Sequence, residues 1–162
     1  MTEGKILAAE HHGAYALKLV GDVRVNLCSS IDDYLEHMYS DPAFESVMVD
    51  LCEAEGIDST TLGLLAKLAL RVRKQFGLRP VIYSCSNGIN RLLQSMAFGK
   101  LFDIREENML NGAVISEIPA VNDEPEVVRE KVIEAHRVLM DLSDENRERF
   151  QDLMTALEHK PG

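Results

Sequence analysis

The chain has 162 residues, of which 46% are hydrophobic, and a formal net charge of −10 at pH 7. This length allows one domain with a sizeable core plus an extension, and the composition argues against wholesale disorder. The acidic balance argues against nucleic acid and anionic membranes as partners, because both attract basic surfaces. No apolar stretch approaches the roughly 20 residues that cross a bilayer, and the first residues lack the apolar core of a signal peptide. We therefore expect a cytoplasmic protein whose partners are other proteins.

Two strand patterns open the chain. Apolar residues at 6–9 and 14–20 predict strands, which His11, His12 and Gly13 join as a hairpin turn. A helix capped by Ser29 or Ser30 is expected at 31–38, followed by strands at 46–52, 80–85 and 101–104 that alternate with helices at 60–76 and 87–98. This alternation predicts an α/β fold in which helices pack on a mixed, mostly parallel β-sheet.

A cluster of hydroxyl side chains precedes the helix expected at 60–76. Asp58 or Ser59 is a natural N-cap, and Gly77 is a natural end for the helix. The unpaired amides of a first helical turn and the helix dipole both favour negative charge. Ser59, Thr60 and Thr61 are therefore expected at an exposed helix start, where a phosphate group would be stabilised. The simpler interpretation is that they only cap the helix.

The loops at the carboxyl ends of the strands are expected to flank the site, because ligands of open α/β sheets gather there. These loops are 53–56 and 85–88. Asp50 is the exception in the otherwise apolar strand 46–52. It is expected either to hydrogen-bond the backbone near the next loop or to steady the loop that carries Ser59 and Thr60.

The stretch from Asp58 to Gly63, which follows a buried strand and leads into a helix, resembles the signature of STAS domains of the anti-sigma factor antagonist family. Similarity to that family continues at 17–24, 80–85, 88–98 and 100–104, and it covers roughly residues 5–105. The resemblance implies that Thr60 is the phosphorylated hydroxyl. Threonine replaces the family's serine there and Thr61 replaces a small glycine, so Ser59 and Thr61 stay open as alternative acceptors. The resemblance also implies a partner-binding surface made of Asp22, Asp58, Ser59, Thr61, Leu62, Ser86 and Asn87.

The function implied by this resemblance is a phosphorylation switch. The unphosphorylated protein would bind an anti-sigma factor or a serine/threonine protein kinase, phosphorylation would release it, and a PP2C-type phosphatase would reset it, with a response regulator as a further candidate partner. An alternative from the same family is a STAS subunit that regulates an ABC-type lipid transport ATPase. The residues beyond 107 weigh against this alternative, since such subunits are compact. A small-ligand binding module is a third reading, for which the sequence offers no pocket-specific residue.

No catalytic or cofactor-binding pattern stands out in the sequence. Its five histidines are scattered and lack metal-ligand spacing, and no phosphate-binding glycine loop or nucleophile elbow is present. We therefore expect no enzyme activity, no cofactor and no metal. Cys28, Cys52 and Cys85 are expected to be reduced, with the last two near the same edge of the sheet.

The composition shifts after residue 107, which divides the chain into a STAS domain at 1–107 and a C-terminal extension at 108–162. Two amphipathic helices are expected in the extension. The first is a helix of about 17 residues with proline in its first turn, and the second is capped near Ser143. The first helix could cover the sheet with the second beside it, or the pair could dock a partner or a second copy.

Overall fold

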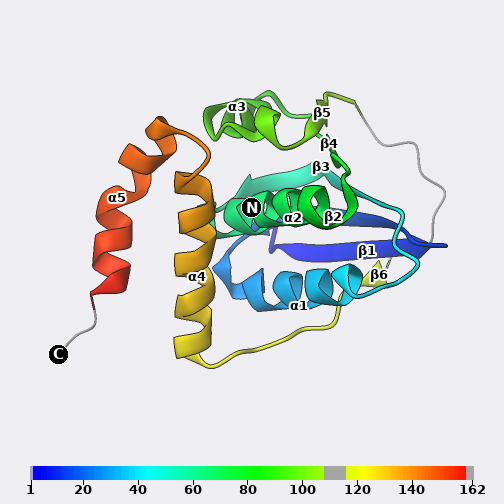
Figure 1. Cartoon of the computed structure of the whole chain (residues 1–162), viewed down its shortest axis with the longest axis horizontal. Helices are drawn as coiled ribbons and strands as arrows, with labels where there is room; N and C mark the ends of the chain where they lie inside the picture. The colour runs from blue at the N-terminus through cyan, green and yellow to red at the C-terminus, as the bar shows by residue number, and fades with distance from the viewer. Residues whose placement is uncertain (1, 108–115, 160–162) are drawn as a thin grey trace.

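The computed structural model describes residues 2–107 and 116–159, and these residues form an α/β fold (Figure 1). Their mixed, mostly parallel sheet has the strand order β5-β4-β3-β2-β1-β6. The strands are β1 (Lys5–His11), β2 (Ala14–Val23), β3 (Ser46–Ile57), β4 (Val81–Tyr83), β5 (Asp103–Arg105) and β6 (Ser116–Glu117). The helices are α1 (Cys28–Tyr39), α2 (Ser59–Phe76), α3 (Asn87–Ser95), α4 (Pro125–Met140) and α5 (Asp144–Glu158). The expected fold class is confirmed.

The sheet begins as an antiparallel hairpin and continues as parallel strands. His12 and Gly13 turn the chain between β1 and β2 with φ angles of 49° and 86°, and β2, β3, β4 and β5 then run parallel. Side chains along β2 alternate between buried and partly exposed, so one face of the sheet carries the core. α1 and α2 lie side by side in front of the strands, and their buried residues join that core (Figure 1).

Several element boundaries differ from the sequence prediction, and two of these differences concern the site. The expected loop 53–56 is a continuation of β3, because β2 keeps pairing with it through a bulge as far as Ile57. α1 begins at Cys28, directly after a short 3-10 turn, and its N-cap residue is Leu27. The predicted caps Ser29 and Ser30 are therefore wrong, since both lie buried inside the first turn of the helix.

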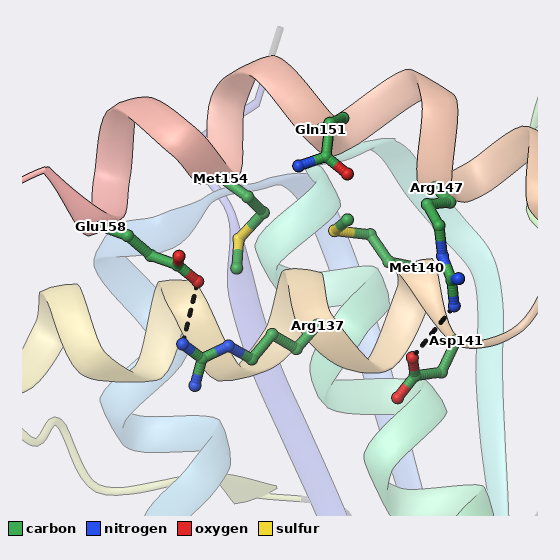
Figure 2. Close-up of a pocket in the computed structure, with 7 residues that line it drawn as sticks. All are labelled: Arg137, Met140, Asp141, Arg147, Gln151, Met154 and Glu158. Carbon is green, nitrogen blue, oxygen red and sulfur yellow. Dashed lines mark hydrogen bonds and ion pairs between the residues drawn. The ribbon is translucent and has the colours of Figure 1, made fainter.

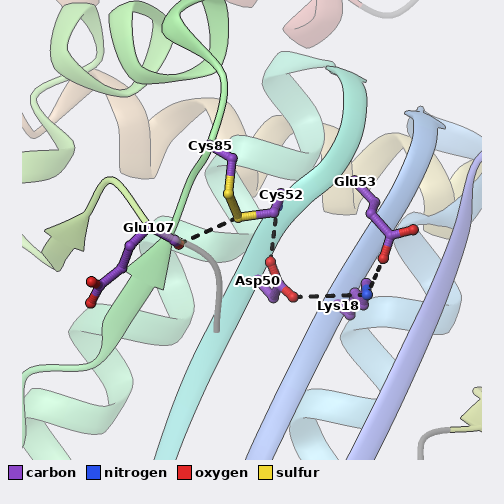
Figure 3. Close-up of a disulfide and its surroundings, with 6 residues drawn as sticks. All are labelled: Lys18, Asp50, Cys52, Glu53, Cys85 and Glu107. Atoms are coloured by element: carbon purple, nitrogen blue, oxygen red, sulfur yellow. Dashed lines mark hydrogen bonds and ion pairs between the residues drawn. A yellow bond between two sulfur atoms is a disulfide. The ribbon is translucent and has the colours of Figure 1, made fainter. Parts of the chain in front are cut away.

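The bulge in β3 explains how the buried Asp50 side chain finds hydrogen-bond partners. One Asp50 oxygen accepts a hydrogen bond of 2.9 Å from the Cys52 amide, and the other lies 4.0 Å from the Lys18 amine, which also pairs with Glu53 (Figure 3). Asp50 thus bonds the backbone locally, as the simpler prediction held. Glu53 and Glu55 lie in β3 rather than in a loop, and Glu55 accepts a hydrogen bond from the Thr2 amide.

Cys52 and Cys85 form a disulfide, which corrects the expectation that all three cysteines are reduced. Their Cα atoms lie 4.8 Å apart, so the bond joins β3 to the residues that precede α3 (Figure 3). Their predicted closeness is confirmed, although the sequence separation of 33 residues offered no motif for the bond. Cys28 is buried, and burial raises the pKa of its thiol.

The predicted C-terminal extension shares the core of the domain before it. β6 pairs with β1, α4 packs across α2, and α5 packs on α4, so that α4 lies between α2 and α5 in Figure 1. Ser143 caps α5 as predicted, by accepting a hydrogen bond from the Asn146 amide. The buried Asn146 side chain then donates to the carbonyl of Met96, beyond the end of α3. The described part of the chain contains no helix long and apolar enough to cross a membrane.

Candidate functional site

The start of α2 is built by a conventional N-cap. Asp58 has an extended backbone, and its side chain accepts a hydrogen bond of 2.9 Å from the Thr61 amide. The helix therefore begins at Ser59, which leaves the hydroxyls of Ser59, Thr60 and Thr61 in its first turn. At the other end Gly77 takes a left-handed conformation with φ of 68°, as its predicted role as helix terminator requires. Of the two caps considered, Asp58 is the one used.

These hydroxyls are largely buried, which contradicts the expectation of an exposed helix start. Thr60 is 5% exposed and Thr61 is fully buried, whereas Ser59 keeps partial exposure. Thr61 shares the helix face of Leu65 and Leu68, which are both buried in the core. The Thr61 hydroxyl makes no hydrogen bond within the described residues. Ser59 and Thr60 are thus better placed than Thr61 to meet another molecule.

His136 of α4 reaches the first turn of α2. Its Nε2 lies 2.7 Å from the Ser59 hydroxyl, and its Nδ1 lies 2.7 Å from the Val132 carbonyl oxygen. A carbonyl oxygen can only accept, so Nδ1 carries a hydrogen, and Nε2 of the neutral ring accepts from Ser59. The imidazole is 1% exposed, and it also packs edge-to-face against Phe150 of α5. A serine on α2 and a histidine on α4 therefore hold the two helices together.

A glycine lets α4 approach α2 closely. A Cβ atom added at Gly63 would lie 2.3 Å from the Ala135 carbonyl oxygen and 2.5 Å from the Ala135 Cβ. These separations are far below van der Waals contact, so a larger side chain at Gly63 would push the helices apart. Gly63 is the last residue of the stretch that resembles the family signature, and in the structure α2 and α4 cross at this residue.

Charged side chains join three helices beside this crossing. Asp32 of α1 pairs with Lys131 of α4 and lies 3.7 Å from Lys67 of α2. Lys67 in turn lies 3.1 Å from Glu134 of α4. The side chains of Asp32, Lys67 and Lys131 are 14%, 23% and 21% exposed, so the network is partly shielded from water. These residues were not singled out from the sequence, because nothing in their local spacing links them.

The other predicted partner-binding residues divide between the two helix starts. Asp22 lies near the end of β2, where it pairs with Arg24 and raises the pKa of that guanidinium. Asp58 is close by, because its amide donates to the Val23 carbonyl. Ser86 caps α3, whereas Leu62 is buried at 1% exposure, as the apolar face of α2 requires. Asn87 is exposed at the start of α3.

The site brings a capped helix start, hydroxyl side chains and a buried imidazole together. The amides at the start of α2 favour an anion, and the hydroxyls there are potential phosphate acceptors. The His136 imidazole supplies the hydrogen-bond partner of the Ser59 hydroxyl. No group of three or more His, Cys, Asp or Glu in the described chain is arranged to hold a metal ion. No protein-family model matches the chain, and no curated protein matches it significantly.

Proposed function

We propose that this protein is a phosphorylation-switched binding protein that acts like an anti-sigma factor antagonist. Unphosphorylated, it binds an anti-sigma factor or a serine/threonine kinase through the start of α2, and phosphorylation there releases the partner. A PP2C-type phosphatase removes the phosphate. The observation that carries this proposal is the capped first turn of α2, where Asp58 orients three consecutive hydroxyl residues beside a helix dipole.

Thr60 is the proposed acceptor by its position in the turn, with Ser59, the more exposed of the two, as the alternative. Both hydroxyls lie in the first turn of α2, at the positive end of the helix dipole. A phosphate adds about −1.5 to −2 charges at neutral pH. It would lie near the Asp58 carboxylate and against a covered surface, so the change would act mainly on the contacts that this surface makes.

The proposal is tested first by phosphopeptide mapping of the chain purified from its own cells. We expect a phosphate on the peptide that contains residues 59–61. Partner capture with the wild-type chain, Thr60→Glu and Thr60→Ala then follows. We expect Thr60→Glu to lose the captured partner and Thr60→Ala to keep it. A loss of about 3 to 4 kcal/mol in binding free energy would lower the affinity some hundreds of fold.

Ser95→Glu is a matched control because it adds the same charge at an exposed hydroxyl on α3, away from the candidate site. It should leave partner capture unchanged. Ser59→Glu and Ser59→Ala identify the acceptor if the Thr60 pair behaves like wild type. The proposed function is wrong if the 59–61 peptide is unphosphorylated and both glutamate variants retain the partner.

A further inference from the structure

We propose that the Cys52–Cys85 disulfide is a reversible redox site. Its exposed Cys85 sulfur exchanges with small thiols of the glutathione class, and the bond fixes the start of α3 when oxidised and frees it when reduced. The start of α3 carries Ser86 and Asn87 of the predicted partner-binding surface. The redox state would therefore change the surface that the proposed function uses. This consequence for the partner rests on the proposed function, whereas the redox site itself does not.

The disulfide lies between the two helix starts of the candidate site. Cys85 directly precedes Ser86, the N-cap of α3. Cys52 lies in β3, whose last residue Ile57 directly precedes Asp58, the N-cap of α2. With Cα atoms 4.8 Å apart, the bond ties the residue before one helix start to the strand that leads into the other (Figure 3). Oxidation therefore sets the position of the α3 start relative to β3.

The backbone ladder between β3 and β4 ends before it reaches the disulfide. Its last pair joins Asp50 to Tyr83, and the Ser84 amide that follows donates to a carbonyl of β5. Beyond this ladder, the disulfide connects β3 to the segment before α3. The body of α3 is held separately, because Ile89 and Leu93 are buried in the core. Reduction should therefore loosen the first turn of α3 and leave the rest of the helix in place.

The two sulfur atoms differ in their access to solvent. Cys85 is exposed, whereas Cys52 is partly buried and its sulfur lies 3.5 Å from the Glu107 carbonyl oxygen (Figure 3). Exposed disulfides are more readily reduced than enclosed ones, and they are often regulatory. The third cysteine, Cys28, is 1% exposed and stands outside the bond. An incoming thiol is therefore expected to attack the Cys85 sulfur.

The exchange takes place in two steps. A glutathione thiolate attacks the Cys85 sulfur, the bond to Cys52 breaks, and Cys52 leaves as a thiolate that takes up a proton. A second glutathione thiolate attacks the glutathione sulfur of this mixed disulfide, which releases Cys85 as a thiolate that is protonated in turn. Two glutathione molecules thus supply two electrons and two protons, and they leave as one molecule of oxidised glutathione. Oxidised glutathione drives the reverse reaction.

Equilibration with glutathione tests the redox site in the full-length wild-type chain. Buffers with increasing proportions of reduced glutathione are followed by alkylation of free thiols and by peptide mass spectrometry. We expect the disulfide to be mostly reduced in a buffer poised like the cytosolic glutathione pool, with Cys28 free of glutathione throughout. Cys28→Ala is the control, because it removes the buried thiol outside the bond and should leave the exchange unchanged.

Two single-cysteine variants identify the sulfur that is attacked. In Cys52→Ser the thiol of Cys85 is free, and in Cys85→Ser the thiol of Cys52 is free. We expect oxidised glutathione to form a mixed disulfide with Cys85 about tenfold faster than with Cys52, because Cys85 is the more exposed of the two. Equal or faster modification of Cys52 would overturn the assignment of Cys85.

Hydrogen exchange of the oxidised and reduced wild-type chain tests the effect on the fold. The amides of Ser84, Ile89 and Asn90 are hydrogen-bonded around the start of α3. We expect them to exchange about tenfold faster after reduction, because the covalent tie to β3 is lost. The amides of Thr61 and Leu62, which bond to Asp58 at the start of α2, should change by less than about twofold.

Residues 150–158 of α5 are a second internal control. They lie across α4 from α2 (Figure 1), beside a shallow pocket. Two ion pairs border this pocket, Arg137 with Glu158 at 2.8 Å and Arg147 with Asp141 at 3.5 Å (Figure 2). Their exchange should not respond to reduction. The Cys52→Ser/Cys85→Ser variant should match the reduced wild type in all three regions and should not respond to glutathione.

Three results would overturn the proposal. The first is a disulfide that stays oxidised at the cytosolic glutathione poise. The second is equal exchange of the α3 amides in both redox states. The third is faster exchange in all three regions together, since reduction would then unfold the domain instead of freeing one helix start. These measurements use no kinase, phosphate or partner, so they can fail while the phosphorylation test succeeds, or the reverse.

Discussion

The first turns of α2 and α3 are capped by the same local chemistry but lie in different environments. Each follows a parallel strand and each is capped by a side chain, with Asp58 accepting from Thr61 and Ser86 accepting from Ile89. The start of α2 is covered by α4, whereas Asn87 and Gly88 at the start of α3 are exposed. The comparison shows that capping residues position a helix start, and that distant segments decide what can reach it.

The two starts are also held by different bonds. Cys85, next to the cap of α3, is joined covalently to Cys52 of β3. The start of α2 is held through non-covalent contacts, in which His136 bonds Ser59 and Ala135 lies against Gly63. The covalent tie keeps α3 near the sheet without burying its first turn. The non-covalent cover instead buries the first turns of α2.

Loss of the disulfide should have the largest effect on stability. The bond closes a loop of 33 residues, for which the chain-entropy relation gives about 3 to 4 kcal/mol. We expect the Cys52→Ala/Cys85→Ala double variant to lower the free energy of unfolding by about 3 kcal/mol, as measured by urea denaturation. Hydrogen exchange should rise at the start of α3 before that of α2. Equal stability of this variant and the oxidised wild type would contradict the structural role of the bond.

Alanine substitution of one glycine from each helix start separates covered from open surface. Gly63→Ala forces a Cβ to within 2.5 Å of the Ala135 side chain, so we expect a loss of about 1 to 3 kcal/mol. Gly88→Ala meets nothing closer than the Ser86 hydroxyl at 3.6 Å, and it should be neutral or stabilising by up to about 1 kcal/mol because alanine favours helix. Urea denaturation of both variants measures the contrast, which disappears if α4 does not contact Gly63 in solution.

The elements that the sequence predicted well are those whose pattern is local. The apolar period of α2, its end at Gly77 and the Ser143 cap of α5 are all confirmed within a few residues. Each depends on side chains one or two helical turns apart. The predicted strand 46–52 missed the end of β3, because the β2 pairing that extends it to Ile57 comes from another part of the chain.

The environment of the candidate site could not be predicted, because long-range contacts determine it. Ser59 and His136 are 77 residues apart, and the sequence shows each as an ordinary polar residue on its own helix. The apolar stripe of α4 indicated that it needs a covering surface, yet the stripe does not say which surface. The Cys52–Cys85 disulfide likewise joins residues that are 33 positions apart in the sequence.

A double-mutant cycle between Ser59 and His136 measures how much the hydrogen bond contributes to closing α4 over α2. Ser59→Ala removes the hydroxyl, and His136→Ala removes the imidazole together with its packing on Phe150. The single His136→Ala loss should be the larger. We expect a coupling energy of about 1 kcal/mol, the usual net contribution of a buried neutral hydrogen bond. Urea denaturation of the four proteins gives the coupling, and a value near zero would mean that the bond does not hold α4.

The smallest expected effect is a pH dependence of the unfolding free energy, caused by Lys131 of α4. Burial lowers the pKa of the Lys131 amine, but its hydrogen bond to Asp32 and the charges of Asp32 and Asp123 raise that pKa by more. Because the pKa of Lys131 is higher in the folded than in the unfolded protein, the charged amine stabilises the fold fully at neutral pH. This stabilisation is lost as the pH rises through the folded-state pKa. The amine keeps contact with water, so the contribution should stay below about 1 kcal/mol.

Lys131→Met removes the charge but keeps much of the side-chain packing. We expect the wild-type protein to exceed this variant in unfolding free energy at pH 7, and the difference should shrink once the pH passes about 10.5. Tyr15 and Tyr39 also have raised pKa values, but both proteins contain them, so their contributions cancel in the difference. Lys74→Met, at an exposed position on α2, should show no such difference at either pH. If the two methionine variants behave alike, the Lys131 charge plays no part in holding α4 over α2.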